Sequence, residues 1–292
     1  METEGLIVPP TTDVLSAKPP MSVTFWGVRG SVPCPGADSL KYGGNTACVE
    51  IRCGEHVLIF DAGTGIRRLG DALAKGSKRT NIELFLSHYH IDHVIGFPFF
   101  KPLHMDGYSV SVWGANGDPA ADVEKVLRKL ISDPLFPVSL VELRAQLTFH
   151  NFRPSDILLP RPGVTIHTAP LCHPGGATGY RVDYAGRSVA YLTDTEFPDG
   201  VIAPEILALA NRTDLIILDC CYTADELALH TGWGHACWEQ GVRLANVANA
   251  KQLCLFHHDP DHDDVFMDAV AEAVEAARPG TTVAAEGMCI DL

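Results

Sequence analysis

The sequence predicts an α/β protein with two β-sheets that are covered by helices and share one active-site edge. Short β-rich segments recur along the 292-residue chain, and helix-like segments lie between many of them. His or Asp residues repeatedly follow the apolar strands, as at Asp61, His88, Asp194 and His257. Strand ends that converge on one edge would gather these side chains, as expected for a layered protein.

The individual elements follow from the spacing of apolar residues. Segment 65–76 places Ile66, Leu69 and Leu73 on one face of a helix. Further helices are expected at 121–131, 204–211, 235–248 and 263–277. Runs rich in β-branched and aromatic residues predict strands at 21–27, 46–53, 56–60, 81–86, 108–114, 140–150, 164–171, 179–184, 187–192, 214–219, 252–256 and near 281–287.

Size and composition predict a globular, cytoplasmic protein. The chain is 46% hydrophobic and 20% charged, which is enough for a substantial core, and its apolar runs fall short of the roughly 20 residues of a membrane span. Residues 1–20, rich in Pro and Thr, predict a loose N-terminal arm, and residues 21–292 a single domain. The nine cysteines are odd in number and form no CxxC pair, so a disulfide framework is not expected.

The charge balance limits the partners. A formal net charge of −14 argues against a surface for long nucleic acids, which are held mainly by Lys and Arg. A small anionic substrate stays possible where metal ions supply positive charge. We expect no membrane partner, and a homodimer remains open.

The segment HYHIDH carries the strongest signal for function. His88 and His90 can point to one side of a strand-to-helix turn, while Asp92 and His93 point to a second position nearby. Imidazole nitrogen and carboxylate oxygen are ligands of zinc, at about 2.0 to 2.2 Å. Four such residues predict two incomplete sites for divalent metal.

Further ligands are expected at later strand ends. His173 follows one apolar strand, Asp194 ends the next strand but one, and His257 ends a third. Each of them alone could be a turn former or a core residue, but their shared position favours a role at the metals. His258 is the alternative to His257.

These motifs resemble the metallo-β-lactamase superfamily, and the likeness runs from about Met21 onward. The resemblance implies a four-layer αββα sandwich that forms one hydrolase domain with two metals at a sheet edge. It implies that one metal is held by His88, His90 and His173, the other by Asp92, His93 and His257, and that Asp194 bridges them. The turn FDAGTG further implies that Asp61 orients a ligand.

Other motifs resemble ribonuclease Z and related phosphodiesterases within that superfamily. The segment GWGHACWEQG is similar to their Gly-His-Ser-Thr helix start, which makes His235 the expected proton donor, although Ala236 and Cys237 replace the Ser-Thr pair. Lactamases of the common zinc class carry Cys at the position of Asp194. Ribonuclease Z has a Gly- and Lys-rich arm for transfer RNA, and segment 117–160 does not resemble it.

We therefore expect a dinuclear metal-dependent phosphodiesterase that acts on a small phosphodiester, with a 3',5'-cyclic nucleotide as the first choice. Zinc is the expected metal, with Mn or Fe as alternatives. A water activated between the metals would attack phosphorus, with His235, Asp92 and Asp194 as catalytic residues. The alternatives are a lactone or thioester hydrolase, a nuclease that processes the tRNA 3' end, and a metal-stabilised module that senses a nucleotide.

Several weaker expectations concern residues around this site. Asp219 could orient His235 or cap a turn, and the pair Cys220-Cys221 is expected in the core rather than at a metal. Arg29 and Asn45 lie in Gly-rich loops that could face a phosphate. The run 97–100, Phe-Pro-Phe-Phe, is the expected pocket wall, while His104, His150, His167, His230 and His262 are expected to be structural or exposed.

Overall fold

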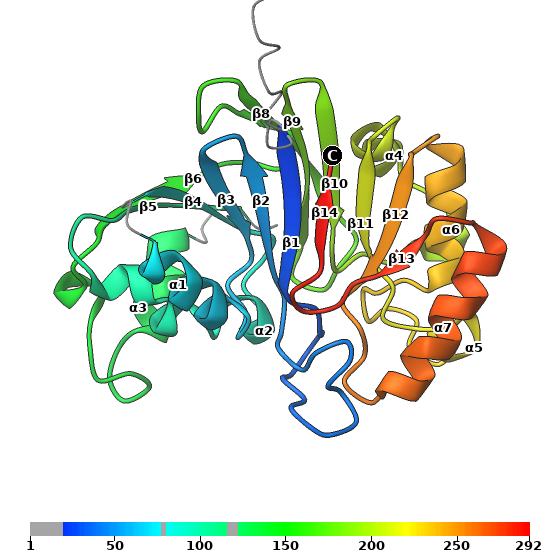
Figure 1. Ribbon diagram of the computed structural model, residues 1–292, viewed down its shortest axis with the longest axis horizontal. Helices are drawn as coiled ribbons and strands as arrows, with labels where there is room; N and C mark the ends of the chain where they lie inside the picture. Colours follow the sequence, from blue (N-terminus) through cyan, green and yellow to red (C-terminus); the bar gives the residue numbers. More distant parts are fainter. Residues whose placement is uncertain (1–19, 77–79, 116–121) are drawn as a thin grey trace, which may run out of the picture.

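The computed structural model describes residues 20–76, 80–115 and 122–292, and these residues form two β-sheets that pack face to face. Figure 1 shows the two sheets side by side with helices outside each of them. This confirms the expected αββα sandwich. The N-terminal arm expected at 1–20 lies outside the described residues except for Pro20.

The first sheet contains the N-terminal strands and closes with the C-terminal one. Its strand order is β14-β1-β2-β3-β4-β5-β6. The strands β3 to β6 run parallel, whereas β14, β1 and β2 pair antiparallel. Their bounds are β1 Met21–Gly27, β2 Cys48–Cys53, β3 His56–Phe60, β4 Asn81–Leu86, β5 Ser109–Gly114, β6 Gln146–Asn151 and β14 Cys289–Asp291.

The second sheet repeats this plan with strands from the C-terminal half. Its order is β13-β12-β11-β10-β9-β8-β7, and β10 to β13 run parallel. Its remaining strands pair antiparallel. The bounds are β7 Ile157–Leu158, β8 Val164–Leu171, β9 Ala177–Tyr184, β10 Arg187–Leu192, β11 Leu215–Asp219, β12 Gln252–Phe256 and β13 Thr282–Val283.

Three apolar clusters hold the layers together. Aromatic rings fill the space between the sheets, where Phe60 stacks on Phe85 at 5.1 Å between ring centroids and meets Tyr180 and Tyr191. The second cluster lies under α1 (Ile66–Lys75) and α3 (Val123–Leu130), and the third under α4 (Pro204–Ala210), α6 (Trp238–Val247) and α7 (Asp264–Ala277). Within the described residues, no helix has the length and apolar character to span a membrane.

Short helices connect these elements near the ends of the strands. The α-helical turns are α2 (Ile91–Val94) and α5 (Ala224–Leu227). Single 3₁₀ turns occupy η1 Phe97–Phe99, η2 Lys101–His104, η3 Leu140–Glu142 and η4 Pro198–Gly200.

The structure corrects two predicted elements. The strand expected over 140–150 begins only at Gln146, because Ser139 and Glu142 form a capping box that starts the 3₁₀ turn η3. The helix expected at 235–248 begins at Trp238, since the side chain of Gln240 accepts a hydrogen bond from the Cys237 N–H. His235 therefore lies in a loop. The edge strands β7 and β14 were not predicted, because each has only two or three residues.

Candidate metal centre

The residues of HYHIDH meet later strand ends at the shared edge of the two sheets. His88 follows β4, and His90 is the N-cap of α2. His173 comes from the end of β8 in the other sheet. The Nε2 of His173 lies 3.0 Å from the Nδ1 of His90, and ligand atoms of all three residues lie within 4.8 Å of one another. The structure thus assembles the first expected triad.

The second expected triad assembles beside the first. The Nε2 of His93 lies 3.1 Å from Asp92 Oδ2 and 3.3 Å from the Nε2 of His257. Asp92 Oδ2 is also 3.4 Å from His257 Nε2. All three residues are buried, and they come from α2 and from the end of β12.

Asp194 lies between the two triads with one oxygen toward each. Its Oδ1 is 3.9 Å from His88 Nε2 and 3.7 Å from His173 Nε2. Its Oδ2 is 3.2 Å from His93 Nε2 and 3.3 Å from His257 Nε2. A carboxylate in this position has the geometry to bridge two metal ions.

Hydrogen bonds at the far side of the rings fix which imidazole nitrogens face the centre. Asp61 Oδ2 accepts from His93 Nδ1 at 2.9 Å, from Tyr191 Oη at 2.8 Å and from Ser87 Oγ at 2.8 Å. Because the Ser87 hydroxyl donates to Asp61, it accepts from His88 Nδ1, 3.0 Å away. As neutral imidazoles, His88 and His93 therefore present the lone pair of Nε2 to the centre.

The donor set fits divalent metal ions. His173 Nδ1 donates to the Gly234 carbonyl at 2.9 Å, so its Nε2 also presents a lone pair inward. His88 Nε2 is buried and has no hydrogen-bond partner among the described residues. Lone pairs that face one another in a buried space repel unless a cation lies between them. Nitrogen and oxygen donors of this kind suit zinc, manganese or iron.

The charges of the centre are strongly coupled. Burial lowers the pKa of His88 well below its usual range, and His93 adds to this effect. Burial also acts to lower the pKa of His93, but Asp92 and Asp194 outweigh it and raise that pKa. Burial acts to raise the pKa of Asp194, but His257, His93 and His88 hold it well below its usual range. Ionised carboxylates among imidazoles are what a divalent cation requires.

Three residues of the site have left-handed backbone conformations. The φ angles are 62° for Asp61, 57° for Asp194 and 62° for His257, each just beyond the end of a strand. Residues other than Gly rarely adopt this conformation, and such strain is common at functional sites. The turns direct all three side chains toward the shared edge.

The structure separates the neighbouring histidines of β12. His257 directs its Nε2 into the second triad, whereas His258 Nε2 donates to the Ala284 carbonyl at 2.8 Å. Burial lowers the pKa of His258 to about 3. Of the two alternatives, only His257 lies among the candidate ligands.

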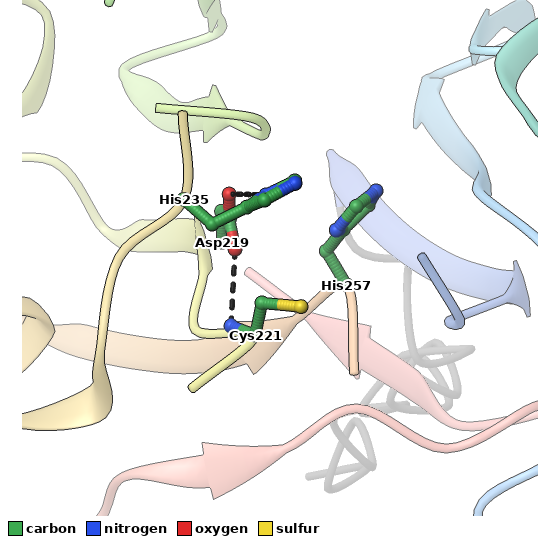
Figure 2. Close-up of side chains that lie close together, drawn as sticks. All are labelled: Asp219, Cys221, His235 and His257. Atoms are coloured by element: carbon green, nitrogen blue, oxygen red, sulfur yellow. Dashed lines mark hydrogen bonds and ion pairs between the residues drawn. The ribbon is translucent and has the colours of Figure 1, made fainter. Parts of the chain in front are cut away.

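A buried group of four side chains adjoins the second triad. Figure 2 shows Asp219, Cys221, His235 and His257 close together, and their ligand atoms lie within 4.8 Å of one another. Asp219 Oδ2 accepts from His235 Nδ1 at 2.8 Å and from the Thr195 N–H at 3.2 Å. Burial acts to lower the pKa of His235, but the charge and hydrogen bond of Asp219 raise it to about 9. Asp219 thus orients His235.

The cysteine pair divides between the core and the site. Cys220 packs in the apolar cluster under α4, α6 and α7. Cys221 is also buried, as expected, and its Sγ lies within the group of possible ligand atoms beside His257. Sequence analysis also missed Ser87 and Tyr191, although Ser87 directly precedes His88.

Arg29 and Asn45 do not face a phosphate site. Arg29 is fully buried and donates to the carbonyls of Gly43, Asp259 and His262. The Asn45 amide donates to Glu286 at 3.0 Å. Both side chains therefore hold loops in place, and that expectation was wrong.

The run 97–100, the expected pocket wall, makes no ring contact with a candidate ligand within the described residues, and Phe99 instead meets the ring of Phe136. Phe97 and Phe100 are buried in the core, while 56% of Phe99 is exposed. Trp113 lies inside as well and stacks on Phe85, whereas 59% of Trp233 is exposed. The histidines expected to be structural or exposed all lie outside the candidate ligand groups of the described residues: His104, His150, His167, His230 and His262.

Comparisons with known proteins agree with the fold. The family model of the beta-lactamase superfamily domain matches residues 56–258, more than half of the chain. Ribonuclease Z of Myxococcus xanthus (strain DK1622) is 22% identical over 296 residues, which cover 85% of this chain and 92% of that protein.

Solved structures share the fold over nearly the whole chain. The metallo-beta-lactamase fold protein YhfI of Bacillus subtilis has a TM-score of 0.69 at 21% identity and covers 93% of this chain and 99% of its own. Human tRNase Z, short form, has a TM-score of 0.66 at 20% identity, with 92% and 98% covered. The chain belongs to the metallo-β-lactamase superfamily; it is a metal-dependent hydrolase and is similar in sequence to proteins named ribonuclease Z.

Proposed function

We propose that the protein is a dinuclear metal-dependent phosphodiesterase that hydrolyses a small phosphodiester, with a 3',5'-cyclic nucleotide as the preferred substrate. The first metal would be held by His88, His90 and His173, and the second by Asp92, His93 and His257. Asp194 would bridge them. Zinc is the proposed metal, with manganese or iron as alternatives.

The observation that carries the proposal is the pair of His235 and Asp219 beside the two triads. Asp219 Oδ2 accepts from His235 Nδ1 at 2.8 Å, which leaves Nε2 free to hold a proton for a leaving group. His235 shares a ligand-sized group with His173 and Asp194, so it lies at the edge of the metal centre. Cleavage of a phosphodiester releases an alkoxide, which leaves poorly unless it is protonated.

The chain's own residues would divide the work at the site. The metals, when bound, would supply Lewis acidity toward the phosphoryl oxygens and lower the pKa of a water. Asp194 would fix the spacing of the two triads. Asp61, Ser87 and Gly234 keep the ligand imidazoles in the tautomer that offers a lone pair inward. His235 would give its proton to the departing oxygen.

The acidic balance of the chain favours a small substrate over a long nucleic acid. The sequence has 36 Asp and Glu against 22 Lys and Arg. Of the segment compared with the ribonuclease Z arm, residues 122–160 form α3, η3, β6 and β7 rather than an extended arm. A mononucleotide needs only the metals to neutralise its phosphate.

A tRNA 3'-end nuclease is the second candidate. It is supported by the likeness to proteins named ribonuclease Z and to human tRNase Z, short form. A thioester hydrolase is less favoured, because a thiolate leaves without a proton donor such as His235. A lactone releases an alkoxide, so the comparison of substrates below separates it from a phosphodiester.

The test compares substrate classes on the metal-loaded protein. We expect turnover of cAMP and of bis-p-nitrophenyl phosphate, with little or no turnover of a lactone, a thioester or a tRNA precursor. Ester turnover with inert phosphodiesters would refute the proposal. Cleavage of the tRNA precursor alone would select the second candidate, and nucleotide binding with no turnover of any substrate would point to a sensor.

A further inference from the structure

Trp233 is an exposed aromatic residue held next to the metal centre. Its relative exposure is 59%, although tryptophan is usually buried to a large extent. The indole meets the His230 ring edge-to-face, with centroids 4.8 Å apart and planes at 80°. A contact of this kind occupies at most one face of the indole, so a second flat ring has room to stack.

The backbone on both sides of Trp233 is fixed by one buried carboxylate. Glu196 accepts from the Gly232 N–H at 2.9 Å and from the Gly234 N–H at 3.1 Å. Both glycines have positive φ, 86° and 85°, which a larger residue adopts only with strain. Glu196 itself lies two residues after Asp194, and its N–H donates to the carbonyl of Cys172, beside His173. Trp233 is thus presented from a rigid turn.

This turn touches the metal centre directly. The Gly234 carbonyl accepts from His173 Nδ1 at 2.9 Å, and a Cβ on Gly234 would lie only 2.2 Å from that nitrogen. Trp233 directly precedes Gly234 in the chain, and consecutive Cα atoms are about 3.8 Å apart. The backbone of Trp233 therefore lies close to the ring of the candidate ligand His173. From the indole, aromatic contacts continue through His230 and Tyr222 to His235.

We propose that Trp233 forms a binding subsite for a flat aromatic base, which stacks on the indole while the attached phosphate lies at the metals. The inference rests on the proposed phosphodiesterase function and adds the chemical class of the group attached to the phosphate. Every nucleobase has a π-face, so stacking selects a nucleotide over a sugar phosphate without choosing one base. The exposed side chain keeps this subsite open to solvent before binding.

The test uses two ligands that differ only by the base. AMP and ribose 5-phosphate are titrated by calorimetry into the metal-loaded protein, so that binding is measured independently of turnover. We expect AMP to bind more tightly than ribose 5-phosphate. Trp233→Ala should weaken AMP roughly 5- to 100-fold, the range of one stacked base, and leave ribose 5-phosphate nearly unchanged. Trp233→Phe should restore most of the AMP affinity.

Controls separate this subsite from a general loss of structure. Phe99→Ala removes another exposed aromatic, which packs against Phe136, and should leave both affinities unchanged. Melting temperature and metal content of Trp233→Ala should match the unchanged protein, because the indole is largely exposed. Equal affinity of the unchanged protein for both ligands, or an equal loss of both in Trp233→Ala, would overturn the inference.

Measurements of binding and of turnover on the same variants distinguish failure of the inference from failure of the proposed function. If no phosphodiester is cleaved but Trp233→Ala still weakens only AMP, the subsite stands and the proposed function falls. If cAMP is cleaved and Trp233→Ala leaves its KM unchanged, the function stands and the subsite falls. In the expected result, KM for cAMP rises in Trp233→Ala while kcat changes little.

Discussion

Asp219→Asn tests how His235 is kept protonated. The charge and hydrogen bond of Asp219 outweigh the effect of burial and raise the pKa of His235 to about 9. Relative to an ordinary value of about 6.5, this corresponds to about 3 kcal/mol in favour of the imidazolium. Asp194 and Asp92 also raise the pKa of His235, but both are candidate metal ligands. Bound metal ions would neutralise their charges, which leaves Asp219 as the carboxylate that keeps His235 protonated.

The substitution removes the charge with little change in position. Asp219 Oδ2 accepts from His235 Nδ1 and from the Thr195 N–H, while Oδ1 accepts only from the Cys221 N–H at 3.0 Å. An Asn whose oxygen takes the Oδ2 position keeps two of the three bonds. Without the charge of Asp219, burial is no longer outweighed, and the pKa of His235 should fall to its ordinary value of about 6.5 or below. At most about a tenth of the molecules would then carry the proton at pH 7.5, so we expect release of an alkoxide to be at least about tenfold slower.

The assay is the pH dependence of kcat with two leaving groups. Hydrolysis of cAMP should fall as pH rises through the pKa of His235, and this fall should begin at a lower pH in Asp219→Asn than in the unchanged protein. Bis-p-nitrophenyl phosphate releases a stable phenolate and should be nearly insensitive. Asp214→Asn, at the start of β11 rather than its end, is the control. An equal loss on both substrates, or an alkaline limb that does not move, would refute the role of Asp219.

Three further predictions concern the ligands, the turn at Gly234 and the buried carboxylate Asp214. His88→Ala should lose one metal per chain by elemental analysis with the fold retained by circular dichroism, and unchanged metal content would remove His88 from the ligand set. Gly234→Ala should displace His173, because its Cβ would lie 2.2 Å from His173 Nδ1. We expect metal affinity, measured by chelator competition, to weaken about 10- to 100-fold. Gly280→Ala is the control and should retain metal affinity, because Gly280 has a similar φ and open space around it. Asp214, whose pKa is lowered by Lys251 and the Ser188 N–H against the effect of burial, should stabilise the fold above about pH 4 and lose that contribution as pH falls through its lowered pKa. Asp214→Asn should therefore cost about 1 kcal/mol in urea unfolding at pH 7 and less at pH 3, and an equal cost at both pH values would contradict this.

Most of the metal centre was predictable because its ligands sit in local patterns. His88, His90, Asp92 and His93 lie within six residues, so one strand-to-helix turn fixes their relative positions. His173, Asp194 and His257 each follow a buried apolar run, and parallel strands bring their carboxyl ends to one edge. The layer order followed from the same alternation of strands and helices.

Other features depended on contacts between distant parts of the chain. Sequence spacing could not separate His257 from His258, because the choice depends on which of them reaches the Ala284 carbonyl of a later segment. The sequence could not show that Arg29 holds loops rather than a phosphate, because its Nη1 donates to carbonyls more than 200 residues away.

The sequence by itself determined the fold class and predicted the candidate metal ligands, since hydrophobic period and strand-end position are local properties. Only the tertiary structure decided which nitrogens face the centre and which aromatic residue remains exposed. Both depend on partners from other elements: Asp61 and Gly234 set the tautomers of His93 and His173, and Glu196 holds the turn of Trp233. Hydrogen bonds between segments far apart in sequence leave no periodic signal, so they appear only when the two sheets meet at their shared edge.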